Sequence, residues 1–209
     1  AETFYNAMKQ EGDPHPVMYG MNSRLVKADG KLQEKVWKSG GLYGAAIDRI
    51  IYWLEKATGV AENGKQAEVL RKLIEFYRTG DLKTFDEYTI LWVQETEAMV
   101  DFTNGFTETY GDPLGLKASW EGYANFKDLE ATARTEKLSA NAQWFEDHSP
   151  VDDRFKKAEC RGVSAKVIKA AILGGDLYPA SAIGINLPNS NWVRAEYGSK
   201  SVTIGNLTD

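Results

Sequence analysis

The chain has 209 residues, of which 43% are hydrophobic and 26% are charged, and its net charge is -5. This composition is typical of a globular protein with one large core or two small ones. The negative charge, without any Lys/Arg-rich run, excludes an ordinary nucleic-acid surface. The apolar runs are too short to cross a bilayer, which takes roughly 20 residues, so we expect no membrane contact. The single Cys160 excludes an internal disulfide, and no signal peptide begins at Ala1, so we expect a cytoplasmic protein.

The N-terminal part carries turn and loop signals. Residues 1–16 predict a short helix followed by a loop, and residues 17–26 predict a short extended segment before the Asp29-Gly30 turn. Residues 32–38 have the composition of the start of a helix.

Three helices with short connections are expected next. Apolar residues recur at helical spacing from Leu42 to Ala57, and the pattern repeats from Lys65 to Thr79. Thr84-Phe-Asp-Glu87 fits a capping box, which predicts that the third helix begins there, with Met99 on its apolar face. Such helices form an antiparallel layer.

After residue 100 the period changes to that of strands. We expect one long strand from Val100 to Tyr110, bulged at Gly105, although Asn104-Gly105 is also a hairpin-turn sequence. Further strands are predicted from Ser119 to Lys127, over residues 183–187 and over residues 201–204. Together they suggest a small mixed sheet or barrel.

Helices are expected between and after these strands. Residues 129–145 have helical composition, and Ser164 is a candidate cap for a helix whose apolar face would include Ile168 and Ile172. One or two helical turns are expected over residues 191–197. The predicted fold class is therefore α+β, with N-terminal antiparallel helices packed on a small β core and an inserted helical segment.

Two stretches combine strand patterns with polar groups. In residues 182–189 an alternating apolar run ends in Asn186 and Asn189, and Pro188 places it at a sheet edge or strand end. In residues 106–115, Glu108 and Tyr110 are spaced to share one strand face. A sheet edge beside two amides suits an extended peptide. A strand that simply runs into an Asn-Pro turn is the alternative.

These stretches resemble the dipeptidyl peptidase III family of zinc aminopeptidases, and its bacterial members most closely. The similarity extends over residues 19–209 and includes Tyr19-Gly-Met-Asn-Ser-Arg-Leu-Val26, Asn141-Ala-Gln-Trp-Phe-Glu-Asp-His-Ser-Pro150 and Gly198-Ser-Lys-Ser-Val-Thr-Ile-Gly-Asn206. Several long segments agree in the right order, which makes the resemblance specific.

The resemblance implies roles for individual residues. Glu108, Asn186 and Asn189 match positions that bind the free N-terminal ammonium of a peptide substrate. Tyr110 matches a tyrosine near the scissile carbonyl and is the candidate catalytic residue. The resemblance also places three residues along the substrate: Glu121 in the cleft, and Gly184 and Ile185 where backbone pairs with the extended peptide.

The zinc site of the family has no counterpart in this sequence. The chain has two histidines, His15 and His148, and no His-Glu-x-x-His or His-Glu-x-x-Gly-His motif. We therefore expect a fragment that binds no metal, whose full-length parent carries zinc in a missing C-terminal lobe.

The expected division of the chain follows from the same resemblance. Residues 1–128 and 170–209 would form the peptide-binding lobe, and residues 129–169 a helical insertion that packs with the missing zinc lobe. The expected partners are an oligopeptide substrate and that lobe, and the fragment alone would be inactive. A stand-alone peptide-binding module and an aromatic-rich glycan-binding module are the alternatives.

Overall fold

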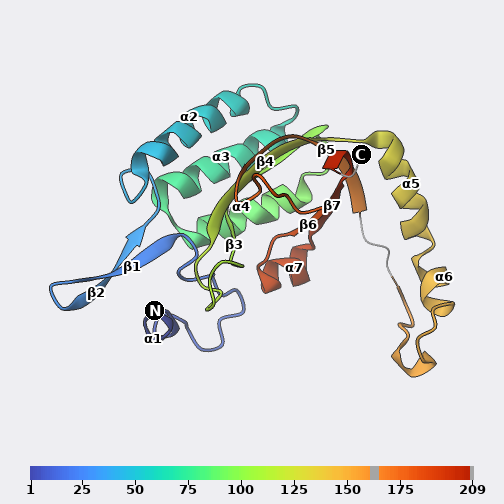
Figure 1. The fold of residues 1–209 in the computed structure, drawn as a ribbon, viewed down its shortest axis with the longest axis horizontal. Coiled ribbons are helices and arrows are strands. Elements are labelled where there is room, and N and C mark those ends of the chain that lie inside the picture. The colour runs from blue at the N-terminus through green and yellow to red at the C-terminus, as the bar shows by residue number, and fades with distance from the viewer. Residues whose placement is uncertain (161–164, 208–209) are drawn as a thin grey trace.

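The computed structural model describes residues 1–160 and 165–207 and has the expected α+β architecture (Figure 1). Three helices, α2 (Gly44–Thr58), α3 (Gly64–Thr79) and α4 (Leu82–Gln94), lie side by side in one layer. Their apolar faces supply most of the main core, and Phe106 and Leu187 supply the sheet side of it. The antiparallel helical layer predicted from the 3.6-residue pattern is confirmed.

The helices pack on one open, mixed sheet. Its strand order is β3-β4-β5-β7-β6, in which only β5 and β7 pair in parallel. The strands are β3 (Val100–Glu108), β4 (Ser119–Lys127), β5 (Ala165–Gly175), β6 (Gly184–Leu187) and β7 (Lys200–Ile204). Because β3 and β6 are the two edges and do not pair with each other, the β core is a sheet and not a closed barrel.

The caps of the helices differ in part from the prediction. The Asn63 side chain accepts from the backbone N–H of Gln66 at 2.8 Å and begins α3, and Gly80 ends this helix with φ +71°. Helix α4 is capped by Asp81, which accepts from both the N–H and the hydroxyl of Thr84. The predicted start at Thr84 was therefore wrong, because an aspartate three residues earlier satisfies the free N–H groups. Helix α4 ends before Met99.

The N-terminal part is a short helix, α1 (Glu2–Asn6), and a hairpin of β1 (Ser23–Ala28) with β2 (Lys31–Val36). The turn at Asp29-Gly30 was predicted, and the extended segment predicted over residues 17–26 overlaps β1 from Ser23 onward. The predicted helix over residues 32–38 was wrong. Both turn residues have positive φ, 51° and 76°, which matches the twist of a two-residue hairpin. The tight turn therefore pairs the following segment as a strand.

The segment after residue 164 is a strand and not the predicted helix. Ser164, the proposed cap, lies outside the described residues. Strand β5 is a central strand that pairs with β4 on one side and β7 on the other, and its Ile168 is 2% exposed. A short apolar run gives no period that separates a buried strand from a buried helix, so the pairing partners decided the outcome.

Strand β3 is one continuous strand, as expected, but its irregularity lies further along. Gly105 pairs in register with Glu121, and the register shifts between Phe106 and Glu108. The strand ends at Glu108, so Tyr110 lies beyond it.

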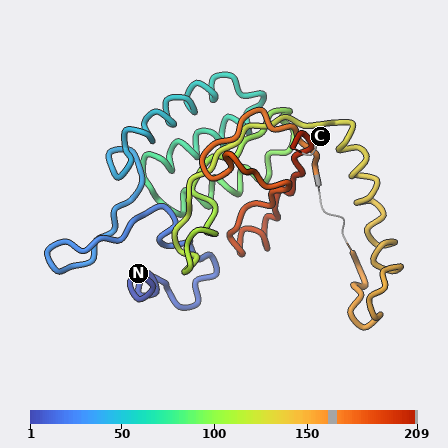
Figure 2. Tube along the Cα trace, in the orientation of Figure 1, coloured from blue at the N-terminus to red at the C-terminus, as the bar shows by residue number. Residues whose placement is uncertain are grey.

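The remaining helical elements lie at the periphery. Helices α5 (Leu129–Ala140) and α6 (Ala142–Asp147) form an arm that extends away from the sheet, as the trace in Figure 2 shows. Helix α7 (Asn191–Tyr197) follows β6, and short 3-10 turns span Asp153–Phe155 and Gly205–Leu207. Within the described ranges, no helix combines the length and the apolar composition that crossing a membrane requires.

Candidate functional site

The end of strand β3 gathers polar groups at one end of the sheet. The register shift at Thr107 turns its hydroxyl toward β4, where it donates to the carboxylate of Glu121. Glu121 is only 1% exposed. A bulge redirects side chains in this way, and here it joins the ends of β3 and β4 through a buried carboxylate.

Asp176, at the end of β5, adds a third carboxylate to Glu108 and Glu121. Gly175 has φ +63°, and a Cβ there would lie 2.2 Å from the Trp120 carbonyl oxygen. Only glycine permits this approach. It brings Asp176 beside β4, where the Asp176 N–H donates to the Trp120 carbonyl and the Asp176 carboxylate accepts from the Ser119 hydroxyl. We call Glu108, Glu121 and Asp176 the carboxylate cluster.

The environment of Glu108 and Glu121 favours their protonated forms. Burial raises the pKa of Glu108, Asn189 lowers it through a hydrogen bond, and the Asp176 charge raises it further. Burial raises the pKa of Glu121 to about 7, with an opposing hydrogen bond from Thr107 and repulsion from the other two carboxylates. Among the described residues no lysine or arginine forms an ion pair with the cluster. The cluster therefore favours a positively charged partner.

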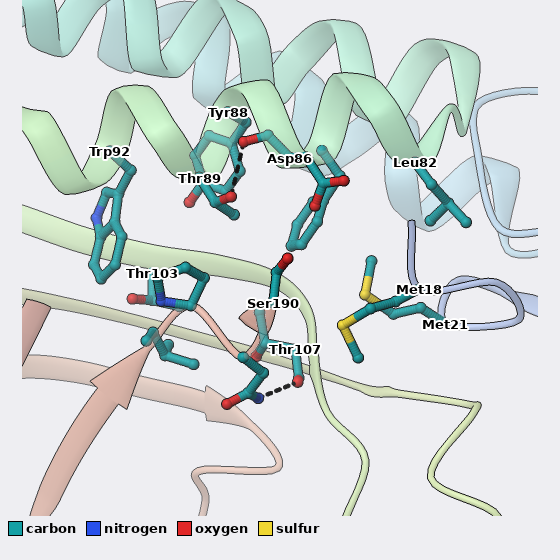
Figure 3. A pocket seen from close by; sticks show the side chains of 14 residues that line it. Met18, Met21, Leu82, Asp86, Tyr88, Thr89, Trp92, Thr103, Thr107 and Ser190 are labelled. Atoms are coloured by element: carbon teal, nitrogen blue, oxygen red, sulfur yellow. Dashed lines mark hydrogen bonds between the residues drawn. The ribbon is translucent and has the colours of Figure 1, made fainter. Parts of the chain in front are cut away.

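Asn189 connects the cluster to strand β6. Its side-chain amide donates to the Thr107 carbonyl at 2.9 Å, the bond drawn at Thr107 in Figure 3. The same amide influences Glu108, so the structure brings together Glu108 and Asn189, as the sequence resemblance implied.

The other predicted residues of this stretch lie along a sheet edge. Gly184, Ile185 and Asn186 pair with β7 on one side only. Their other side is the free edge of β6, which provides backbone donors and acceptors. The Asn186 side chain accepts from Ser201 at 3.2 Å, and within the described part of the chain no hydrogen bond joins it to the carboxylate cluster.

Tyr110 is separate from these groups in the structure. Its ring is 93% exposed, in the turn after β3. It therefore lies near Glu108 in the sequence but does not contact the carboxylate cluster.

A large cleft adjoins Glu108. It has a volume of about 1000 Å³, and its lining includes Trp37, Arg49, Glu108, Lys117 and Trp120. Clefts of this size accommodate extended small ligands and short peptides. The lining carries charges of both signs, with Glu108 and Asp112 against Arg49 and Lys117, and such groups can fix the orientation of a ligand.

No pattern in the sequence marked Asp176 or Thr107 as members of the site. Gly174-Gly175-Asp176 is a turn signal after an apolar run, but only the pairing of β5 with β4 brings this turn to Glu121 and Ser119. The structure was needed to find them.

The described residues do not fit a zinc site. None of them form a group of three or more His, Cys, Asp or Glu side chains that could hold a metal ion. His15 pairs with Glu196 at 2.7 Å, and the His148 ring bonds to the Trp144 carbonyl.

Comparison with known proteins gives consistent results. Residues 20–209 match the family model described as Peptidase family M49. Dipeptidyl peptidase 3 from Rattus norvegicus and from Homo sapiens are each 28% identical over 167 residues, which is 80% of this chain and 22% of the relative. The protein of the same name from Dictyostelium discoideum is 29% identical over 170 residues. This chain thus spans about a fifth of the length of these relatives.

Two solved structures share the fold. DPP III from Caldithrix abyssi superposes with a TM-score of 0.81 at 23% identity, over 98% of this chain and 39% of that chain. Dipeptidyl-peptidase III from Corallococcus sp. strain EGB superposes with a TM-score of 0.71 at 24% identity, over 99% and 38% respectively.

Proposed function

Because the chain belongs to peptidase family M49, we propose that it forms the peptide-binding part of a metallopeptidase that releases dipeptides from the N-termini of oligopeptides. The observation that carries the proposal is the grouping of Glu108, Glu121 and Asp176 beside Asn189, with no ion pair to a lysine or arginine among the described residues. An N-terminal ammonium has three donors and no acceptor. It would supply the missing positive charge.

The chemistry of recognition follows from burial. A half-buried carboxylate is costly without a partner, and a peptide ammonium forms charge-assisted hydrogen bonds with it. An acetylated peptide has no positive charge and would leave Glu108 unpaired. In this proposal the carboxylate cluster selects peptides with a free N-terminus.

The edge of β6 would hold the peptide backbone. Backbone groups alternate in direction along an antiparallel pair. The Ile204 N–H bonds to the Ile183 carbonyl, so Ile185 directs its backbone groups to β7 and Gly184 directs its own to the free edge. A peptide that adds as a strand would use the groups of Gly184. Two extended residues span about 7 Å. An ammonium fixed at Glu108 would therefore place the second peptide bond at a constant distance from the cluster.

The hydrolytic step would need groups beyond those described. Zinc, when bound by a peptidase of this kind, supplies an activated water and polarises the carbonyl. The described residues do not fit this metal, so we assign its ligands to a separate lobe of a longer chain. We propose that Tyr110, with its freely exposed phenol, turns toward the scissile carbonyl when such a lobe closes over the peptide. We also propose that the protein acts in the cytoplasm.

The helical arm is the proposed contact with that lobe. Its exposed apolar side chains are Leu129, Leu138, Trp144, Phe145, Val151 and Phe155. They lie within the insertion predicted over residues 129–169, of which residues 165–169 belong to strand β5 and so to the sheet. Exposed apolar side chains gathered on one arm favour a partner surface.

Calorimetric titration tests the proposal. We expect an unblocked tetrapeptide to bind and its N-acetylated twin to bind at least tenfold more weakly. Glu108→Gln should remove this discrimination, whereas Glu136→Gln on the exposed face of α5 should keep it. Equal binding of the two peptides would contradict the ammonium assignment, and binding of neither would contradict the proposal that this chain alone forms the site.

The alternatives make different predictions. A stand-alone peptide-binding protein would bind the same peptides, and the longer gene product would contain no zinc motif. A glycan module would need exposed tryptophans in one groove with Glu108 and Asn189 apart. The bond of Asn189 to the Thr107 carbonyl, next to Glu108, argues against this reading, as does the placement of the exposed Trp53 on α2 and Trp144 on α6.

A further inference from the structure

Three lysines converge at the opposite end of the sheet from the carboxylate cluster. Lys127 ends β4, Lys166 lies at the start of β5, and Lys200 begins β7. They line a cavity of about 80 Å³ together with Asn125 and the segment that follows α4. This cavity adjoins the point where the chain leaves the sheet for α5 (Figure 1).

Two of the ammonium groups are held next to each other. Lys127 and Lys166 both donate to the Thr96 carbonyl oxygen, at 2.7 and 3.2 Å, and Lys127 also donates to the Glu97 carbonyl. Neither ammonium forms an ion pair with a carboxylate in the described part of the chain. Each keeps at least one N–H donor that these bonds do not use.

The two acidic groups nearby are already engaged. Asp101 accepts from Lys200 at 2.9 Å, from the Trp92 indole at 3.0 Å and from the Phe102 N–H at 2.8 Å. Glu95, which is 4% exposed, accepts from Asn63 and from the N–H groups of Glu97 and Ala98. Three ammonium groups thus face two carboxylates, which leaves one positive charge in excess.

Burial and mutual repulsion disfavour the charged forms of Lys166 and Lys200. Burial lowers the pKa of Lys166, and the charges of Lys127 and Lys200 lower it further. Burial also lowers the pKa of Lys200, against the attraction of Asp101. Binding of an anion between them would relieve this repulsion.

A buried amide provides an independent indication of a ligand. Asn125 is 3% exposed, and its side-chain oxygen has no hydrogen-bond partner among the described groups. The β4–β5 register shifts between Ala124 and Asn125, and bulges of this kind redirect side chains beside binding sites. A buried polar group without a partner is costly. An amide turned by 180° would present its NH₂ group to an acceptor in the cavity.

We propose that this cavity binds a small oxyanion, such as inorganic phosphate or sulfate, through Lys127, Lys166, Lys200 and the Asn125 amide. Its volume is between two and three times the roughly 30 Å³ that one water occupies in the liquid, which is compatible with an anion of four oxygens. Converging ammonium donors and a neutral amide match the acceptors on such an anion. This site is independent of the proposed peptide site.

Titration with inorganic phosphate at pH 7 tests the proposal. Ionic strength is held constant with sodium chloride, and binding is followed by calorimetry and by amide shifts of β4 and β7 in NMR spectra. We expect saturable binding to one site by phosphate and by sulfate, and at least tenfold weaker binding of acetate, which offers two oxygens.

Two variants separate this site from general charge effects. Lys166→Met should weaken phosphate binding at least tenfold, whereas Lys137→Gln, at an exposed lysine of α5, should leave it within twofold. Asn125→Asp keeps the side-chain shape and adds a repelling charge, so it should also weaken binding at least tenfold. Melting temperatures verify that the variants are folded.

Three results would overturn the proposal. The first is an absence of saturable binding up to tens of millimolar phosphate. The second is that chloride displaces phosphate as well as sulfate does, and the third is an unchanged phosphate affinity in Lys166→Met. If Lys166→Met fails to fold, the Asn125→Asp comparison decides.

Discussion

Asp86 is a buried acid whose replacement should stabilise the protein in a pH-dependent way. It lies on α4 and is 7% exposed, and within the described ranges its carboxyl group has no hydrogen bond and no ion pair. Figure 3 shows it at a cavity that Ser190 and Thr107 also line. Burial raises the pKa of Asp86 to about 7, with repulsion from Asp81 and an opposing attraction from His15.

The sign of the effect follows from proton linkage. The unfolded chain loses the Asp86 proton near pH 3.8, and the folded chain keeps it until about pH 7. Between these values the folded state binds more protons, so stability falls as the pH rises through this window. Above pH 7 the folded protein carries a buried, unpaired charge.

The magnitude is large compared with typical stabilities. Each pH unit between the two pKa values corresponds to about 1.4 kcal/mol, so the full difference corresponds to roughly 4 kcal/mol at pH 8. Asn has nearly the same shape and no charge. We therefore expect Asp86→Asn to change stability little at pH 4 and to raise it by up to about 4 kcal/mol at pH 8.

Urea unfolding of both proteins between pH 4 and pH 8 measures this difference. Glu68→Gln, at an exposed position of α3, is the matched control. Its difference in unfolding free energy from wild type should be the same at every pH. A constant difference between wild type and Asp86→Asn across the range, or a loss of stability at pH 8, would refute the reasoning.

Three further predictions concern the sheet and the core. The gain in stability of Glu121→Gln over wild type should be larger at pH 8 than at pH 4, by at most about 3 kcal/mol, because burial raises the pKa of Glu121 to about 7. A gain that does not change with pH in urea unfolding would contradict this. Gly175→Ala should destabilise the folded protein by several kcal/mol, because its Cβ would lie 2.2 Å from the Trp120 carbonyl oxygen. The control Gly12→Ala has φ +76° and open space around the new Cβ, so it should cost only about 1 kcal/mol. Equal losses in Tm would show that the close approach is unimportant. Leu73→Ala, at a side chain with 0% exposure, should cost about 2–5 kcal/mol in chemical unfolding, and a loss below 1 kcal/mol would mean that the helical layer collapses around the cavity.

Local sequence patterns predicted elements whose signals are strong. The helices over residues 42–57 and 65–79 have long apolar stripes, and the strand over residues 119–127 has clear alternation. Their boundaries depend on near neighbours, such as the Asn63 cap and Gly80. Such signals act within a few residues, so they can be read without the rest of the fold.

Elements with short or ambiguous patterns could not be predicted in this way. Residues 32–36 became part of β2 because the Asp29-Gly30 turn pairs them with β1, and β5 became a strand because it lies between β4 and β7. The same apolar residues would suit a helix in another environment. The pairing partners, which are distant in sequence, decided these elements.

The residues of the candidate sites also fall into those that the sequence suggested and those that only the tertiary structure revealed. By itself, the sequence identified Glu108 and Asn189 through their resemblance to a peptidase family, and it established that no zinc motif is present. Only the tertiary structure brought Asp176 to Glu121 and the three lysines to Asn125, because these groups come from strands that meet through sheet pairing. It alone also decided which acids are buried, since desolvation depends on every element that covers a side chain and not on its neighbours in the chain.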